Sequence, residues 1–258
     1  MAFRNGKALL RHRKQQPLAR RRPGQGPSQP GPAARQADAL NEMTSDALER
    51  GPDGRLRCFW AVGPAPEYAA YHDEEWGRPL LGDDELFERM CLEGFQSGLS
   101  WLTILRKREA FRVAFADFDI ASVAAFGEDD VQRLLADPGI VRNRRKIEAA
   151  VNNARLALEL AREHGSLAAF LWSFRPRRQK PIRRREDYVA TTPEAEAMAK
   201  ELRARGFRFL GPTTLYAGMQ ACGIVNDHAE GCCVREEVER EQRAAAELIA
   251  RKTSGQCL

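Results

Sequence analysis

Residues 131–154 read VQRLLADPGIVRNRRKIEAAVNNA. The first half of this stretch has apolar residues at helical spacing and ends at 137-DPG-139, because proline and glycine terminate helices. A second amphipathic segment follows 140-IVRNRRK-146, which is rich in cations. The pattern predicts two helices joined by a short glycine-containing turn, which is a helix-hairpin-helix unit.

The turn of this hairpin carries the groups of an anion-binding site. Backbone N–H groups in a turn that contains Gly139, beside a helix N-terminus, attract negative charge. The cations next to the turn are Arg142, Arg144, Arg145 and Lys146. We therefore interpret these residues as a clamp on a DNA phosphate. A solvated basic loop is the competing interpretation, because runs of charge are often only exposed to solvent.

The chain beyond residue 80 has helical periodicity nearly throughout. No persistent alternation of period two and no Asn-Gly hairpin is present, so we expect an all-α protein with short loops. Helix starts are indicated by Asp83-Asp84, Asp119, Ser166 and Thr192 as caps, with Pro193 at a first helical position and Gly206 as a stop.

Charge divides the chain into parts. Residues 1–36 hold nine Lys or Arg and no acidic residue, which leaves 32 basic against 36 acidic residues in 37–258. The first 50 residues are rich in Arg, Pro, Gly and Gln, a composition that cannot bury enough apolar surface to order itself. We predict a disordered basic tail over 1–50, a domain over 51–235 and an amphipathic helical extension over 236–258. The composition of the tail also fits an organelle transit peptide. A wrongly assigned start codon is another explanation, since Met43 lies just before the expected domain.

Cysteine use and hydropathy indicate the compartment. Six cysteines without a dense framework do not suggest a disulfide-stabilised secreted protein. The longest uncharged stretch, 209–226, is interrupted by Gly, Pro, Thr and Gln and is a poor membrane span. We expect a cytoplasmic protein without membrane association. A second basic run, 175-RPRRQKPIRRR-185, favours a polyanionic partner at one face.

Cysteine and histidine occur in two close pairs near the ends of the expected domain. His228 and Cys232 lie four residues apart in 226-NDHAEGCC-233, and Cys58 and His72 lie fourteen apart. Two thiolates and two imidazoles are a common ligand set for a structural zinc, although this spacing matches no common zinc finger. Buried apolar cysteines and hydrogen-bonded histidines are the alternative interpretation.

Several motifs together resemble the 3-methyladenine DNA glycosylase I family, a family of helix-hairpin-helix repair enzymes. The resemblance spans about residues 57–233. The motifs, in the family's order, are RCFWAV (57–62), EYAAYHDEEWG (67–77), LFERMCLEGFQSGLSWLTILRKRE (86–109), GIVRNRRKI (139–147), FLWSF (170–174), RGFRFLGPTTLYAGMQACGIVNDH (205–228) and GCC (231–233).

The resemblance implies a helix-hairpin-helix glycosylase fold whose N- and C-terminal parts are joined by one structural zinc. It places the zinc ligands on Cys58, His72, His228 and Cys232, with Cys233 as a neighbour that does not bind the metal. One position departs from the family's pattern, since Phe95 stands where the family has Gln.

The same resemblance implies a pocket for a flipped base. It gives Glu93 the role of accepting hydrogen bonds from the base, Trp60 and Trp101 a stacking role, and Tyr71 a polar contact. Leu99 would fill the gap that the base leaves in the duplex. For the aromatic residues and for Leu99, an ordinary place in the core is the alternative.

The chemistry of the substrate explains why so few acid–base groups are needed. Methylation at N3 makes adenine a cation, so the base leaves as a neutral molecule. Many helix-hairpin-helix glycosylases place an Asp some two dozen residues after the hairpin glycine, but 140–165 contain no Asp. We expect a monofunctional glycosylase that acts, as a monomer, on double-stranded alkylated DNA in a bacterial cytoplasm.

Two functions of other classes compete with this one. A zinc-stabilised helix-hairpin-helix DNA-binding protein without catalysis needs no carboxylate among aromatic rings, so Glu93 speaks against it. A Cys–His hydrolase would need Cys58 or Cys232 as a free nucleophile. A zinc chelator separates these classes, because a structural-zinc protein loses its fold when the metal is removed.

Overall fold

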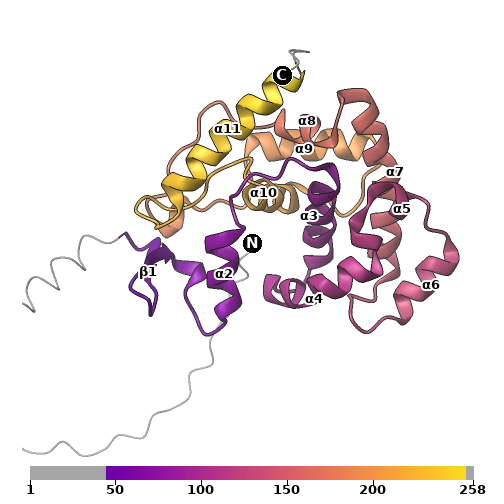
Figure 1. Cartoon of the computed structure of the whole chain (residues 1–258), viewed down its shortest axis with the longest axis horizontal. Coiled ribbons are helices and arrows are strands. Elements are labelled where there is room, and N and C mark those ends of the chain that lie inside the picture. Colours follow the sequence, from indigo (N-terminus) through magenta and orange to yellow (C-terminus); the bar gives the residue numbers. More distant parts are fainter. Residues whose placement is uncertain (1–44, 254–258) are drawn as a thin grey trace, which may run out of the picture. The chain divides into compact units, whose positions relative to one another are not determined.

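The computed structural model describes residues 45–253, and within them the fold is helical apart from one short hairpin (Figure 1). The strands are β1 (Leu48–Arg50) and β2 (Leu56–Cys58). The longer helices are α2 (Pro66–Glu74), α3 (Asp83–Gln96), α4 (Trp101–Ala114), α6 (Glu128–Ala136), α7 (Arg144–His164), α9 (Pro193–Ala204), α10 (Pro212–Ala221) and α11 (Arg235–Thr253). The short ones are η1 (Phe59–Ala61), η2 (Ala116–Phe118), α5 (Ile120–Ala124), α8 (Leu167–Trp172) and η3 (Arg185–Asp187).

The antiparallel hairpin of β1 and β2 corrects the predicted domain start. Leu48 pairs with Cys58 and Arg50 pairs with Leu56, so residues 48–50 belong to the folded unit and not to a tail that ends at residue 50. Strands this short leave no periodic pattern in a sequence, which is why none was predicted. Residues 45–47 of the predicted tail are also described, and Ala47 is buried. Residues 1–44 lie outside the described residues.

Helix α3 is the centre of the core. It packs against α4, α7, α8 and α10, and nearly every side chain from Leu86 to Phe95 is buried. Phe95, the departure from the family pattern, is 1% exposed and packs against Phe111 and Phe115 at ring-centroid distances of 4.7 and 5.7 Å. Phenylalanine at this position therefore extends an aromatic core.

The predicted helix caps are confirmed with one exception. Asp119, Ser166 and Thr192 accept hydrogen bonds from the first turns of their own helices. Asp83 and Asp84 do not cap α3, which begins after Gly82. Their carboxylates instead accept from the backbone N–H of Ala168 in α8 and Ile120 in α5, both at 2.9 Å. They stabilise the starts of two other helices, which a local pattern cannot indicate.

Helix α11 occupies the predicted C-terminal extension up to Thr253 and packs against α8. Its buried Gln242 donates hydrogen bonds to the carbonyl oxygens of Gly77 and Val225, at 2.7 and 3.0 Å. Arg78 forms ion pairs with Glu237 and Glu241 of the same helix. The extension is thus fastened to both ends of the domain. Among residues 45–253, no helix is long and apolar enough to cross a membrane.

Candidate active site and metal centre

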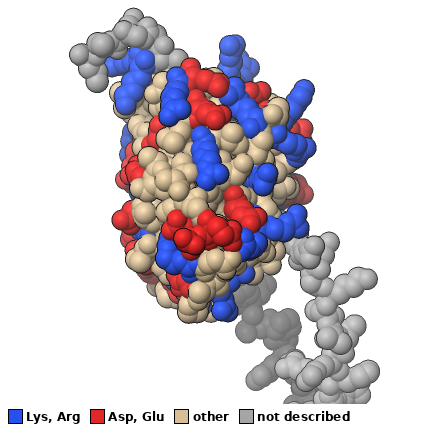
Figure 2. Space-filling model, turned by 90° about the vertical axis from the view of Figure 1, so that its right-hand side faces the viewer, with Lys and Arg blue, Asp and Glu red and all other residues tan. Residues whose placement is uncertain are grey.

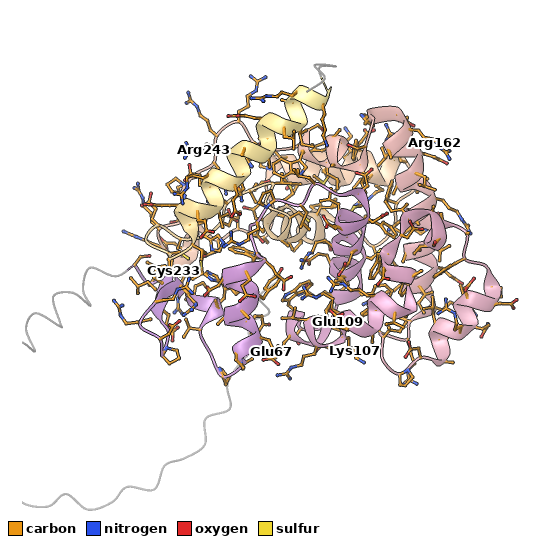
Figure 3. All side chains as sticks on the ribbon, in the orientation of Figure 1. Glu67, Lys107, Glu109, Arg162, Cys233 and Arg243 are labelled. Carbon is orange, nitrogen blue, oxygen red and sulfur yellow. The ribbon has the colours of Figure 1, made fainter. Side chains whose placement is uncertain are left out.

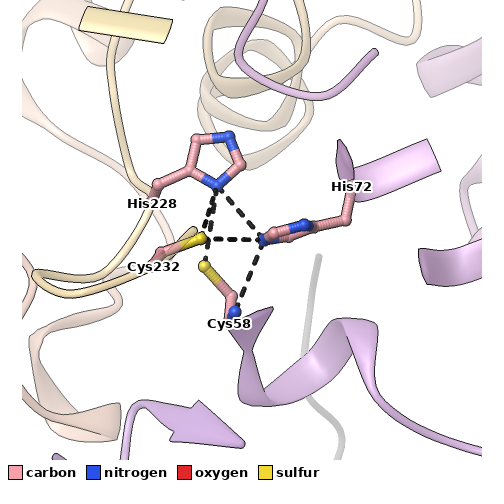
Figure 4. A group of neighbouring side chains, drawn as sticks. All are labelled: Cys58, His72, His228 and Cys232. Carbon is pink, nitrogen blue, oxygen red and sulfur yellow. Dashed lines mark hydrogen bonds between the residues drawn. The ribbon is translucent and has the colours of Figure 1, made fainter. Parts of the chain in front are cut away.

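Two cysteines and two histidines from opposite ends of the fold meet in a buried cluster (Figure 4). Cys58 ends β2, His72 lies in α2, and His228 and Cys232 lie between α10 and α11. Their ligand atoms all lie within 4.8 Å of one another. His72 Nε2 and His228 Nδ1 are 3.2 Å apart, and Cys232 Sγ lies 3.4 Å and 3.6 Å from them. Cys58 Sγ is 3.7 Å from His228 Nδ1.

These distances fit a tetrahedral metal site. With metal–ligand bonds of about 2.0–2.3 Å, tetrahedral geometry places neighbouring ligand atoms about 3.3–3.8 Å apart. The side chains of Cys58, His72 and His228 are fully buried, and that of Cys232 is nearly so. The four predicted ligands therefore form one cluster that could hold a metal ion.

The outer contacts of the cluster fix the orientation of both imidazoles. His72 Nδ1 lies 2.8 Å from a carboxylate oxygen of Asp73, and His228 Nε2 lies 2.9 Å from the carbonyl oxygen of Trp76. Such partners hold the other ring nitrogen toward a metal. Asp73 is itself bound by the guanidinium of the buried Arg57. The exposed Cys233 (Figure 3) is not a member of the cluster, as predicted.

A second cluster joins a carboxylate, a guanidinium and two aromatic rings. Tyr71 and Trp101 are buried, with ring centroids 5.4 Å apart. The guanidinium carbon of Arg89 lies 5.5 and 5.6 Å from the two centroids, and Arg89 donates a hydrogen bond of 3.2 Å to Tyr71 Oη. Glu93 follows Arg89 by one helical turn in α3. Arg89 was not predicted, although a basic residue four positions before Glu93 on an apolar helix is a signal for it.

Glu93 is buried, and no hydrogen bond joins its carboxylate to another residue of the described chain. The residue is 6% exposed, and its carboxylate forms no ion pair within residues 45–253. Burial raises the pKa of Glu93 to about 7, while the charge of Arg89 opposes this shift. Burial likewise raises the pKa of Tyr71, so its phenol stays protonated. Trp101 Nε1 is also buried and has no hydrogen-bond partner in the described part of the chain. Unpaired buried polar groups are costly and mark places where a ligand is bound.

Trp60 lies nearer the metal cluster than the other predicted aromatic residues do. Its ring contacts Trp76 at 4.8 Å and His72 at 5.3 Å, both edge-on. In the described chain it forms no ring contact with Tyr71 or Trp101. The structure thus brings Tyr71 and Trp101 together, whereas Trp60 packs against His72 of the Cys and His cluster.

The helix-hairpin-helix unit consists of α6, the turn 137–143 and α7. Helix α7 begins at Arg144, and its N-cap Asn143 accepts from the N–H of Lys146. The N–H of Gly139 donates to Asp137 Oδ1 at 2.7 Å. Lys107 of α4 (Figure 3) donates to the carbonyl oxygens of Pro138 and Gly139, both at 3.0 Å. The turn is therefore held from both sides.

The cations of the hairpin differ in their environment, and for Lys146 our prediction is wrong. Lys146 is 8% exposed, and its ammonium donates to the carbonyl oxygens of Phe95 and Ser97 at 2.8 and 2.7 Å, so it does not face a phosphate. Arg144 is shared between Glu128 and Glu148. Arg142 and Arg145 are exposed. On the side of the molecule that carries α6, basic and acidic side chains are interspersed (Figure 2).

The second basic run is largely engaged within the protein. Arg175 donates to the carbonyl oxygen of Ile224, Arg183 pairs with Glu230, and Lys180 pairs with Asp187. The run therefore supports a broad polyanion surface less than its sequence indicates.

The catalytic Asp of other helix-hairpin-helix glycosylases has no counterpart in residues 140–165, and two acidic residues of this segment lie on the surface of α7. Glu159 is exposed, and Glu163 pairs with Arg205.

Leu99 lies in the turn between α3 and α4. It is 42% exposed, and the preceding Gly98 has φ +84°, a conformation that favours glycine. Ser100 ends the turn by capping α4 through the N–H of Thr103. An apolar side chain held outward on a short turn is unusual for a core residue, so the structure favours the surface role over the core alternative.

Comparison with known proteins adds to this geometry. Residues 60–236 match the family model of the methyladenine glycosylases. The chain belongs to this family. It is 46% identical to DNA-3-methyladenine glycosylase 1 of Escherichia coli (strain K12), over 69% of this chain and 95% of that protein. It is 41% identical to DNA-3-methyladenine glycosylase of Haemophilus influenzae, over 68% of this chain and 96% of that protein.

Solved structures of the family have the same fold. A crystal structure of 3-methyladenine DNA glycosylase I aligns with a TM-score of 0.65 at 47% identity, covering 69% of this chain and 98% of that one. A structure of the Staphylococcus aureus enzyme, described as the structural basis of its 3-methyladenine recognition, aligns with a TM-score of 0.64 at 38% identity, covering 67% and 93%. Cys58 lies two residues before the range of the family match, and nearly all of α11 lies beyond it.

Proposed function

We propose that this protein is a monofunctional DNA glycosylase that hydrolyses the N-glycosidic bond of 3-methyladenine in alkylated double-stranded DNA. The observation that carries the proposal is the buried carboxylate of Glu93, which accepts no hydrogen bond from residues 45–253 and whose charge acts on Tyr71, the partner of Trp101 in a ring contact. π faces and an opposing negative charge are what a cationic purine needs and what neutral adenine does not use. Membership of the methyladenine glycosylase family supports the same substrate.

The reaction follows from the charge of the base. When the C1′–N9 bond breaks, its electron pair moves into the methylated purine and cancels the positive charge, while a water molecule forms the new C1′–O bond and releases one proton to solvent. In this proposal Glu93 accepts hydrogen bonds from the flipped base, and Trp60 and Trp101 contribute aromatic faces. Arg89 donates a hydrogen bond to Tyr71 Oη, so the hydroxyl group of Tyr71 can in turn donate a hydrogen bond to the base. Leu99 fills the gap in the duplex.

We further propose that the Cys58, His72, His228 and Cys232 cluster holds one structural zinc. The donor set of two thiolates and two imidazoles, its burial and its spacing support this metal. When bound, the ion supplies a structural cross-link between the two ends of the domain and takes no part in base release. We also propose a monomer that works in the bacterial cytoplasm and binds duplex DNA through Gly139, Arg142 and Arg145. In this proposal the N–H of Gly139 and the guanidinium of Arg144 exchange their partners Asp137 and Glu128 for phosphate.

Release of free 3-methyladenine from alkylated duplex DNA tests the proposal directly. The expected result is release of the intact base with the DNA strand left uncut, because no hairpin lysine is placed to form a Schiff base. Tight binding to alkylated DNA without any base release would instead favour a DNA-binding protein that lacks catalysis.

We predict an acidic limb in the pH dependence of base release. Since burial raises the pKa of Glu93 to about 7, the carboxyl group is neutral below that pH and ionised above it. The value of kcat/KM should therefore rise with pH through about 7 and then level off. Steady-state rates between about pH 5.5 and 8.5 measure this. A flat profile over this range would show that ionised Glu93 is not required.

We predict that the basic N-terminal segment strengthens DNA binding without affecting catalysis. Because β1 begins at Leu48, the deletion should remove residues 1–44 and spare the hairpin. Loss of the cations of residues 1–44 should weaken DNA affinity mainly at low salt. It should also flatten the dependence of the logarithm of the DNA-binding constant on the logarithm of salt concentration, while base release at saturating enzyme stays unchanged. Fluorescence anisotropy over a salt series compares the two forms. Identical salt slopes would show that the segment does not contact DNA.

A further inference from the structure

The loop between α9 and α10 presents an exposed aromatic residue on a strained backbone. Phe209 has φ +59°, in the left-handed region that residues other than glycine rarely adopt, and it is 36% exposed. Strain of this kind persists only where the surroundings impose it, and it often marks a functional position. Few large apolar side chains of residues 45–253 are as exposed; the others are Leu99, Val113 and Val189.

Helix α7 imposes the conformation of this loop. The side-chain amide of Asn153 donates to the carbonyl oxygen of Arg208 and accepts from the N–H of Arg208, both at 2.9 Å. Asn152 donates to the carbonyl oxygen of Gly206 at 3.0 Å. On the other side, the loop lies against α3, because a Cβ atom at Gly94 would be 3.7 Å from the carbonyl oxygen of Phe209. The backbone of the loop is thus held in place from two helices.

The surroundings of the ring are suited to a polyanion. The guanidinium of Arg145, an exposed cation of the hairpin, lies 6.0 Å from the ring centroid, and the exposed Arg208 precedes the ring. Arg145, Arg208 and Phe209 line one open groove together with Glu148. The carboxylate of Glu148 is paired with Arg144, so the groove retains a positive balance.

The same end of α7 also holds the turn that carries Leu99. Lys146 follows Arg145, and its ammonium binds the carbonyl oxygens of Phe95, in the last turn of α3, and of Ser97, the C-cap of that helix. Lysine in this position caps the C-terminus of a helix. The first turn of α7 therefore contacts the hairpin turn, the Leu99 turn and the ring of Phe209, and it fixes these three features relative to one another.

We propose that Phe209 is a second apolar contact to the DNA duplex, which packs against a base step beside the one that Leu99 enters. Apolar side chains inserted at base steps unstack and bend DNA, which helps to extrude a nucleotide. The ring would act on the DNA and not on the flipped base, since it lies on the hairpin side of α3. This inference rests on the proposed glycosylase function.

Replacement of Phe209 by Ala and by Gly tests the inference, with Val113→Ala as a control that removes a more exposed apolar side chain elsewhere on the surface. Affinity for a duplex that contains an abasic-site analogue should fall about 5- to 100-fold in both Phe209 variants and stay unchanged in the control. The salt slope should stay at the wild-type value, because no phosphate contact is lost, whereas Arg145→Ala should flatten it. Binding of free 3-methyladenine should not change.

The glycine variant separates a DNA contact from a structural role. Glycine adopts φ +59° without strain, so Phe209→Gly should melt at a temperature no lower than that of Phe209→Ala while losing the same DNA affinity. Wild-type DNA affinity in both variants would overturn the proposal. So would equal losses of DNA binding and free-base binding, which would indicate a disturbed fold. Failure of the wild type to release any base would count against the glycosylase function, while the affinities would still report on Phe209.

Discussion

Replacing Glu93 by Gln will lower single-turnover excision of 3-methyladenine by about 30- to 1000-fold, which corresponds to the loss of a charge-assisted hydrogen bond in a buried site. The substitution keeps the size of the side chain. It removes the negative charge and one acceptor, which an amide cannot replace when the partner is a cationic base. Measurement of released base after mixing excess enzyme with alkylated duplex DNA gives the rate.

The same variant should fold at least as well as the wild type, and this separates function from structure. When folding raises the pKa of a carboxyl group, the folded protein becomes less stable as the pH rises from the ordinary pKa of that group through about 7. Glutamine does not ionise, so the variant avoids this loss of stability. At pH values above 7 it should melt at a temperature equal to or higher than that of the wild type. Glu159→Gln, at an exposed position of α7, is the matched control and should release base normally. Wild-type excision by folded Glu93→Gln would mean that the base binds elsewhere.

Replacing His228 or Cys58 by Ala will destabilise the protein by more than about 4 kcal/mol, because an incomplete structural zinc site forfeits much of the folding energy that the metal supplies. We expect one zinc per chain in the purified wild type and a substoichiometric content in these variants. Elemental analysis and thermal unfolding measure the two quantities on the same samples.

Cys233→Ala is the control for the metal site, since Cys233 is exposed and adjacent to Cys232 but has no place in the cluster. It should retain full zinc content and wild-type stability. A folded wild type that carries no metal would refute the zinc proposal, and loss of zinc in Cys233→Ala would mean that the ligand set is wrong.

Several features could be predicted from the sequence because local chemistry determines them. The hairpin turn at 137–143 follows from Asp137-Pro138-Gly139, and the caps Asp119, Ser166 and Thr192 follow from side chains that bind their own helix. The Cys and His pairs were identified because these residue types are few in this chain. Chemistry alone left the metal open, and the resemblance to a family favoured zinc.

Other features depend on partners that are distant in the sequence. Lys146 reads as one more cation of a basic loop, yet its ammonium binds carbonyl oxygens at Phe95 and Ser97. Asp83 and Asp84 look like caps of the helix they begin, but they serve helices that start much later in the chain. The position of Arg89 one turn before Glu93 is a signal in the sequence, but its contacts with Tyr71 and Trp101 form only when α2 and α4 bring those rings to it. In each case the tertiary structure selects one of several partners that the side chain can bind.

The positions of the metal ligands also set the order in which this protein can be completed during synthesis. Cys58 and His72 leave the ribosome early, but His228 and Cys232 emerge only after α3 to α10 have been made. Helix α11, which reaches back to Gly77 and Val225, emerges last. Contacts between such distant residues form late and slowly. Until then the nascent chain exposes Cys58 and His72 without their partners, so under the zinc proposal the supply of metal bears on the final step of folding, after the helical core already exists.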